Sequence, residues 1–188
     1  PQTRGGWLFW LSMIITGCLG MFFRDPERVI PQGETVIVSP ADGKIILIQE
    51  VQEPAWGEEK YLQVSIFMSV FNVHVNRSPI AGTVENVKYN PGKFFAAFEP
   101  KASLQNEQTT IVLSQTTNGK TVQVLVKQIA GLIARRIVCY AKPGMHFERG
   151  ERIGLICFGS RVDLFLPLET VLSVKLHDKV KGGSTIIG

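Results

Sequence analysis

Three residues of this sequence, Ser160, His74 and Asp42, are of types that could together carry nucleophilic chemistry. Ser160 follows a glycine between two apolar stretches, and His74 lies in the segment VFNVHVNRSP. Asp42 lies in the segment SPADGKI. A serine hydroxyl attacks a carbonyl poorly until a base accepts its proton, and histidine suits that task near neutral pH. An aspartate can hold the imidazole in the correct tautomer and stabilise its charged form. These residue types therefore define a candidate for serine-based acyl chemistry.

Each of the three residues taken alone also has a purely structural interpretation. A single histidine in an apolar strand is more often a packed core residue, and Asp42-Gly43 alone is an ordinary turn. A serine that follows a glycine is equally typical of a turn. The other two histidines, His146 and His177, lie in polar turn contexts, and we expect both to be solvated. The residue types by themselves leave the catalytic and the structural interpretations open.

The elements that must position these residues are predicted to be short β-strands. After residue 24 the chain has apolar, β-type segments bounded by Gly, Pro, Asn or Asp, which are typical of strands and tight turns. They cover residues 36–38, 45–48, 62–68, 82–87, 111–113, 122–129 and 153–158. The repeated frames SPADGKI and SPIAGTV resemble the hairpins of barrel-sandwich domains of the lipoyl and biotinyl type. We therefore expect a mainly β fold with little helix. Its core would be a compact antiparallel β-sandwich or barrel-like domain, with His74 inside a strand.

The N-terminal end of the chain differs in composition from the rest. Residues 5–23 carry no charge and would span about 28 Å as a helix, close to the hydrocarbon thickness of a bilayer. Two tryptophans near one end and an arginine at each flank resemble interfacial anchors. A buried core helix is the alternative, although such helices usually have a polar face. We expect residues 1–24 to form a hydrophobic membrane-attachment helix, spanning or re-entrant, and residues 25–188 to form the catalytic β-domain.

Length and composition exclude several other classes of protein. A chain of 188 residues with 45% hydrophobic and 19% charged residues corresponds to one folded domain rather than a disordered tail. Twenty Lys and Arg against sixteen Asp and Glu give a net charge of +4, which suits a membrane surface. No dense basic run indicates nucleic acid. Three widely spaced cysteines exclude a disulfide scaffold and a cysteine-based zinc site, and we expect no metal.

Four segments, in order and after a hydrophobic N-terminus, resemble the phosphatidylserine decarboxylase family in its short bacterial and archaeal form. They are SPADGKI around Asp42, FMSVFNVHVNRSP around His74, QIAGLIARRIV over residues 128–138 and ICFGSRVDLFLP around Gly159-Ser160. The resemblance runs from about residue 22 to the C-terminus. Arg161 departs from the longer relatives, which have threonine after the serine.

The resemblance implies a proenzyme that cuts itself without hydrolysis of the peptide bond. The Gly159-Ser160 bond breaks, which leaves a large chain of residues 1–159 and a small chain of residues 160–188 that stay together as a heterodimer. Ser160 becomes a pyruvoyl group at the start of the small chain, and this covalent cofactor is the electron sink for decarboxylation. The implied substrate is phosphatidylserine, and the implied product is phosphatidylethanolamine.

Within that resemblance the candidate residues take defined roles. His74 accepts the proton of the Ser160 hydroxyl as it attacks the preceding carbonyl, and Asp42 orients the imidazole. In the decarboxylation, His74 or a water molecule returns the proton to the product. Gly183-Ser184-Thr185 competes as a cleavage site by its residue types. We favour Ser160, because a cut at Ser184 would leave too few residues to hold a buried cofactor.

Two alternatives to this function remain, and the resemblance also implies a location. An archaetidylserine would present the same serine head group to the same site. A non-catalytic, membrane-anchored barrel-sandwich binding module would leave the Gly159-Ser160 bond intact. We expect the protein at the cytoplasmic membrane, with its catalytic domain on the cytoplasmic side. A homo-oligomer is compatible with the sequence, and nucleic acid is not an expected partner.

Overall fold

Strands are the main regular element in the described part of the chain. The computed structural model describes residues 6–52, 60–97, 99, 102–117, 119–132, 136–157 and 159–188. Within these ranges the elements are, in chain order, α1 (Gly6–Phe22), β1 (Gly43–Gln52), β2 (Lys60–Met68), β3 (Val75–Arg77), β4 (Gly82–Asn90), α2 (Ala102–Gln105), β5 (Gln108–Thr117), β6 (Lys120–Ala130), β7 (Ile137–Cys139), β8 (His146–Phe147), β9 (Arg152–Ile156), β10 (Ser160–Pro167) and β11 (Lys179–Val180). The mainly β fold predicted from the turn-bounded apolar segments is confirmed. Phe158 of the predicted cleavage motif and residues 1–5 of the predicted N-terminal segment lie outside the described residues.

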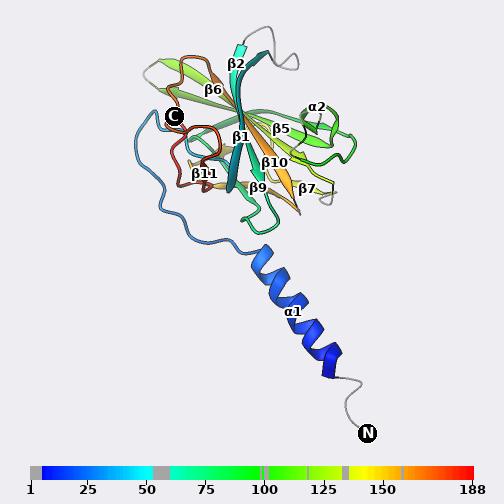
Figure 1. Cartoon of the computed structure of the whole chain (residues 1–188). Coiled ribbons are helices and arrows are strands. Elements are labelled where there is room, and N and C mark those ends of the chain that lie inside the picture. Colours follow the sequence, from blue (N-terminus) through cyan, green and yellow to red (C-terminus); the bar gives the residue numbers. More distant parts are fainter. Residues whose placement is uncertain are drawn as a thin grey trace.

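The strands form one large and one small antiparallel sheet. The large sheet has eight strands in the order β11-β1-β2-β10-β6-β5-β4-β8, and the small sheet has three in the order β3-β9-β7. The large sheet curls around buried side chains as a half-barrel (Figure 1). Strands that follow each other along the chain, such as β1 with β2 and β5 with β6, pair with each other. The expected antiparallel β-domain therefore takes the form of a curled sheet with a small second sheet.

Strand β10 lies in the middle of the large sheet, and its two faces differ. It pairs with β2 on one side and with β6 on the other. Because side chains alternate along a strand, Val162 and Leu164 point into the main hydrophobic core, and Ser160 shares their face. Arg161 and Asp163 point to the opposite face, where they form a buried ion pair with 2.6 Å between Nε and Oδ1. The predicted cleavage site is thus at the start of a central strand, on its core side.

Two local predictions differ from the structure. Residues 36–38, predicted as a strand, contribute only an isolated bridge to the C-terminal segment. His74, predicted inside a strand, lies in the loop that precedes β3. The reason is the turn after β2, in which the N–H of Asn72 donates to the Ser69 carbonyl and the Asn72 side-chain oxygen accepts from Ser69. This turn ends the extended run and redirects the chain ahead of His74.

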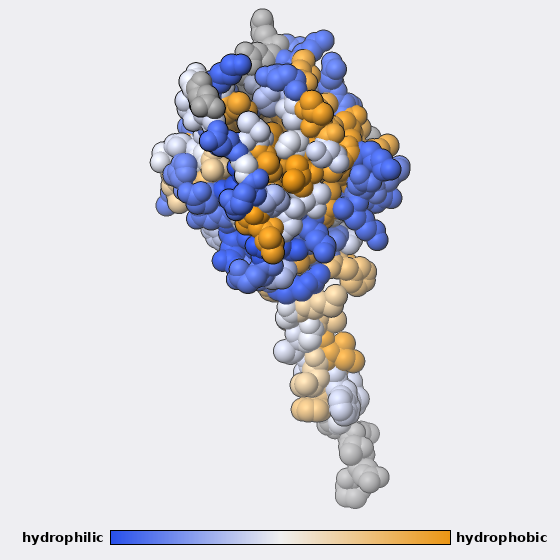
Figure 2. All heavy atoms as spheres, turned by 90° about the vertical axis from the view of Figure 1, so that its left-hand side faces the viewer, coloured by the Kyte–Doolittle hydropathy of each residue, from blue (hydrophilic) through white to orange (hydrophobic). Residues whose placement is uncertain are grey.

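Helix α1 projects away from the β-domain (Figure 1). Most of its side chains are exposed. Figure 2 shows it as a column of mostly apolar residues below the domain. A helix in this segment is therefore confirmed. It has 17 described residues, and no helix within the described ranges combines the length and the apolar character needed to cross a bilayer. Attachment of α1 to a membrane stays a prediction.

Candidate active site

The bond between Gly159 and Ser160 lies where the chain enters the middle strand of the large sheet. β9 ends at Ile156, and the chain reaches β10 by way of Gly159, whose φ of +65° is in the left-handed region that glycine adopts without strain. Ser160 is fully buried and pairs with Met68 of β2 and with Ala130 of β6. The bond predicted to be cut is therefore held on its Ser160 side by two neighbouring strands.

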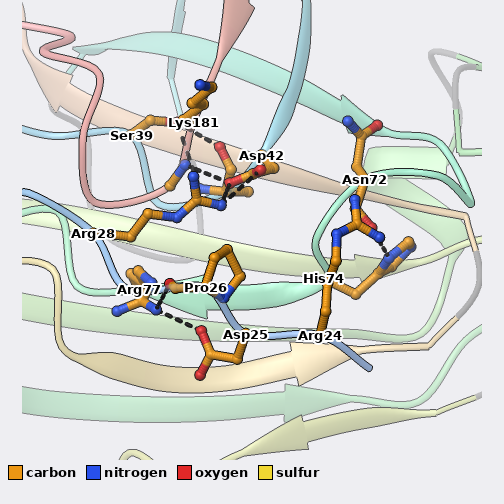
Figure 3. A network of polar contacts seen from close by, with 12 residues as sticks. Arg24, Asp25, Pro26, Arg28, Ser39, Asp42, Asn72, His74, Arg77 and Lys181 are labelled. Atoms are coloured by element: carbon orange, nitrogen blue, oxygen red, sulfur yellow. Dashed lines mark hydrogen bonds and ion pairs between the residues drawn. The ribbon is translucent and has the colours of Figure 1, made fainter. Parts of the chain in front are cut away.

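From the loop between β2 and β3, His74 contacts the residue that precedes this bond, Gly159. Its Nε2 atom accepts a hydrogen bond of 3.3 Å from the backbone N–H of Gly159. Its Nδ1 atom lies 2.9 Å from the carbonyl oxygen of Asn72 (Figure 3). A backbone N–H can only donate and a carbonyl can only accept, so both contacts require the neutral tautomer with its proton on Nδ1. The fold thus brings His74 to the predicted cleavage site with the lone pair of Nε2 directed at the Gly159 amide.

Burial keeps the imidazole of His74 in this neutral form. The residue is 2% exposed, and desolvation lowers its pKa below the ordinary histidine value. Three smaller effects act on the same pKa: the hydrogen bond to the Asn72 carbonyl raises it, the charge of Arg24 lowers it, and the charge of Asp42 raises it. A histidine with a lowered pKa is unprotonated near neutral pH, which is the state that a general base requires.

Asp42 lies near His74, but its hydrogen bonds go to other groups. Nη2 of Arg28 lies 2.9 Å from both carboxylate oxygens, and the backbone N–H of Gly182 donates to the carboxylate at 2.7 Å (Figure 3). Among the contacts of the described residues, none joins Asp42 to His74 by a hydrogen bond, and Nδ1 is held by the Asn72 carbonyl instead. The structure therefore does not place Asp42 in the orienting role predicted for it. Its effect on the imidazole is that of a nearby charge.

The Ser160 hydroxyl points towards a methionine. Its Oγ atom lies 3.4 Å from Sδ of Met68, the residue that pairs with Ser160 on β2. A thioether sulfur is a weak acceptor, so this contact holds the hydroxyl proton only weakly. The hydroxyl is therefore one residue away from the amide that His74 contacts, and no strong acceptor among the described residues competes for its proton.

The other serine and histidine candidates lie in a turn or on the surface. Ser184 is half-buried in a turn in which its backbone N–H donates to the Lys181 carbonyl at 3.1 Å. His146 is an exposed residue of β8, and His177 is exposed with a φ of +75°. The predicted solvation of both histidines is confirmed.

A glycine beyond the end of β6 leaves room for the carbonyl of the bond predicted to be cut. A Cβ atom on Gly131 would lie 2.1 Å from the carbonyl oxygen of Gly159, which is too close for any real contact. The position of a Cβ atom is fixed by the backbone, and the Gly159 oxygen is itself a backbone atom. Neither can therefore move aside by a change of side-chain rotamer. The missing side chain at position 131 is therefore a requirement of the geometry around the Gly159 carbonyl.

Substitution of this glycine should disturb the cleavage reaction directly. We expect Gly131→Ala to slow self-cleavage by about a hundredfold, because a shift of about 1 Å at a reacting group has an effect of that size. The measurement is the rate at which newly made protein is cut, followed on denaturing gels. Gly17→Ala is the control, since a Cβ atom there meets nothing within 4 Å. Normal cutting of Gly131→Ala would show that the Gly159 carbonyl does not need this space.

Asn72, Met68 and Gly131 contribute to the site although the sequence does not single them out. Asn72 acts through its carbonyl, Met68 through a weak contact to Ser160, and Gly131 through the absence of a side chain. Only Asn72 has a usable signal, because an asparagine just before an apolar strand is typical of a turn. The other two positions depend on which strands become neighbours.

A serine that opens a buried strand, with a neutral histidine hydrogen-bonded to the glycine before it, is the arrangement expected of a protein that processes its own chain. The chain belongs to the phosphatidylserine decarboxylase family, whose characteristic pattern matches residues 15–188. The family resemblance carried by the four ordered segments is thereby confirmed.

Curated relatives match nearly the whole chain. A protein of Desulfotalea psychrophila named phosphatidylserine decarboxylase proenzyme is 49% identical over 181 residues, which are 96% of this chain and 83% of the relative. A protein of the same name from Nitrosomonas europaea is 47% identical over 190 residues, or 99% of this chain and 85% of the relative. A third, from Amoebophilus asiaticus, is 49% identical over 166 residues, or 88% of this chain and 72% of the relative.

Proposed function

We propose that this chain cuts itself between Gly159 and Ser160 and then decarboxylates phosphatidylserine to phosphatidylethanolamine. The observation that carries the proposal is the hydrogen bond of 3.3 Å from the Gly159 N–H to Nε2 of His74, which holds a base at the residue on the N-terminal side of the Gly-Ser bond. Membership of the family supports the decarboxylation. The relatives' common name, phosphatidylserine decarboxylase proenzyme, supports both the substrate and the processing step.

The residues of the chain can supply the chemistry of the first reaction. Neutral His74 accepts the proton of the Ser160 hydroxyl, and the oxygen attacks the carbonyl carbon of Gly159. The bond from that carbon to the Ser160 nitrogen breaks, the nitrogen takes up the proton, and an ester joins the two residues. Elimination releases Gly159 as a carboxylate and leaves dehydroalanine at position 160. Water converts this group to a pyruvoyl group and ammonia.

The surroundings of position 160 fit a pyruvoyl group. The position is fully buried, and the pairing of β10 with β2 and β6 would keep the small chain in the sheet after the cut. Val162 and Leu164 anchor the same strand in the core. A pyruvoyl group here would supply the carbonyl that accepts electrons as the substrate loses CO2. His74, beside this position, can hold or return a proton.

Membrane attachment through α1, on the cytoplasmic side of the cytoplasmic membrane, is part of the same proposal. The large apolar side chains of the segment from Trp7 to Phe23, apart from Phe22, are 45% to 67% exposed. Such side chains are unfavourable in water and favourable in the interfacial region of a bilayer. Arg24 and the net charge of +4 favour an anionic lipid surface. Attachment would bring the site to the head group of a lipid that stays in the bilayer.

Liposomes that contain phosphatidylserine test this proposal with two measurements. We expect the purified full chain to float with anionic liposomes in a density gradient. We also expect it to release CO2 from phosphatidylserine with formation of phosphatidylethanolamine. Archaetidylserine in the same liposomes tests the lipid tails, and phosphatidylglycerol controls for surface charge. A cut protein that decarboxylates no serine lipid would contradict the activity. A protein that turns over bilayer lipid without floating would contradict attachment.

A further inference from the structure

The end of α1 contacts the proposed catalytic histidine. Phe22, the last residue of α1, is 5% exposed, whereas its neighbour Phe23 is 55% exposed. The Phe22 ring lies against the His74 imidazole, with 4.2 Å between the ring centroids and 35° between the ring planes. The buried side chain of a helix that is otherwise exposed is therefore packed on the residue at the cleavage site.

Charged residues hold the helix end in this position. The Arg24 guanidinium donates to the carbonyl of Phe71 at 2.7 Å, which ties the end of α1 to the loop between β2 and β3. The next residue, Asp25, pairs with Arg77 of β3 at 2.5 Å and with Arg152 of β9. Figure 3 shows Arg24 beside His74 and Asp25 facing Arg77. The contact between Phe22 and His74 is thus supported by polar contacts on the residues that follow the helix.

We propose that Phe22 is a positioning residue for His74 in self-cleavage, so that the end of the N-terminal helix completes the catalytic site. The inference rests on the proposed function, in which His74 is the base. An imidazole with a ring packed on one face and a hydrogen bond on Nδ1 has little freedom to rotate, which keeps Nε2 at the Gly159 amide. The helix therefore has a role at the reacting bond in addition to membrane attachment.

Phe22 also excludes water from one face of the imidazole. Burial is the main reason that the pKa of His74 lies below its ordinary value, and the Phe22 ring contributes to that burial. The charged groups that act on His74 are Arg24, which lowers the pKa, and Asp42, which raises it. Both remain in a Phe22 variant. Exposing the imidazole should raise its pKa towards the ordinary value, so a smaller fraction is neutral at a given acidic pH.

The test measures the pH dependence of self-cleavage in the full-length chain. Protein is made with a pulse of labelled amino acid in a cell-free system that contains liposomes. It is then transferred to buffers from about pH 5 to about pH 8, on both sides of the ordinary histidine pKa, and cleavage is followed on denaturing gels. We expect Phe22→Ala to slow cleavage at about pH 6 by about tenfold, through misplacement and protonation of the base. The acidic limb of its rate profile should move to higher pH.

Two further variants separate positioning from loss of apolar surface. Phe23→Ala removes an equally large side chain from the same end of the helix, but from an exposed position. The ring contact described for Phe23 is edge-on to Phe22, with 5.0 Å between centroids, whereas the ring described against the imidazole is that of Phe22. The rate of Phe23→Ala should stay within about twofold of wild type, as expected of a surface substitution. Phe22→Tyr keeps the packed ring and should restore both the rate and the pH midpoint.

The outcomes distinguish this inference from the proposed function. An unchanged pH midpoint in Phe22→Ala would contradict the inference even if less protein is cut, because poor folding lowers the yield without moving the midpoint. If Phe22→Ala does not fold, Phe22→Leu provides the same test, with a smaller upward shift expected because leucine covers less of the imidazole. A wild-type chain that is not cut, or a His74→Ala chain that is cut equally fast, would instead contradict the proposed function.

Discussion

Changing Ser160 to alanine should leave the protein as one uncut chain without decarboxylase activity. The substitution removes the oxygen that would attack the Gly159 carbonyl. Without the ester there is no leaving group whose elimination would give dehydroalanine, so no pyruvoyl group forms. Ser160 is fully buried, and the hydrogen-bond partner of its Oγ among the described residues is the weak acceptor Sδ of Met68. Loss of the hydroxyl should therefore leave the packing of β10 intact. We therefore expect complete loss of self-cleavage and little change in the stability of the fold.

A denaturing gel and an intact-mass measurement decide this prediction. Wild-type protein should give a large chain that ends at Gly159 and a small chain that begins at position 160 with a blocked, pyruvoyl N-terminus. Ser184→Ala is the matched control, since Ser184 also follows a glycine but lies in the turn after β11, and it should be cut normally. If Ser160→Ala is cut and Ser184→Ala is not, the cleavage site is at Ser184 and not at Ser160. A wild-type chain that stays whole would favour the non-catalytic binding module.

His74→Ala should slow self-cleavage by about 10²–10⁴-fold, the range in which general base assistance contributes. The imidazole is the group at the Gly159 amide, and in its neutral tautomer Nε2 carries no proton and has the lone pair that a base needs. His146→Ala is the control, because that histidine is exposed on β8 and far from β10 in the order of the large sheet. Circular dichroism and the melting temperature show whether each variant is folded. If folded His74→Ala protein is cut at the normal rate, His74 is not the base for self-cleavage.

Asp42→Ala in the same assay separates a direct from an indirect role of the carboxylate. An aspartate that orients the imidazole would make this variant as slow as His74→Ala. Its observed partners, Arg28 and the N–H of Gly182, favour a smaller effect on the rate together with a lower melting temperature. The reason is that removal of the carboxylate leaves a nearly buried guanidinium without its ion pair. If Asp42→Ala and His74→Ala slow cleavage equally, Asp42 orients the imidazole as the aspartate of a Ser-His-Asp triad does.

The β class and two members of the site could be predicted because they depend on local features of the sequence. Apolar segments between turn residues mark the strands, and Gly159 before an apolar run marks the entry to β10. The segment around His74 and the Gly-Ser pair match the family motif in their amino-acid identities. The role of Asp42 could not be predicted in this way. Its carboxylate is taken by Arg28 and by Gly182, which lies near the other end of the chain, and only the fold decides which donors reach it.

The sequence alone was enough to predict the mainly β class, most of the strand segments and the residue types available for serine chemistry. These properties follow from side-chain alternation and from the backbone preferences of single residues. Only the tertiary structure decided that Phe22 of an exposed helix packs on His74 and that Gly131 faces the Gly159 carbonyl. Contacts between residues far apart in the chain depend on strand order, on register and on the curl of the sheet. A local pattern of amino acids does not specify these three properties, so it cannot show which distant side chains meet.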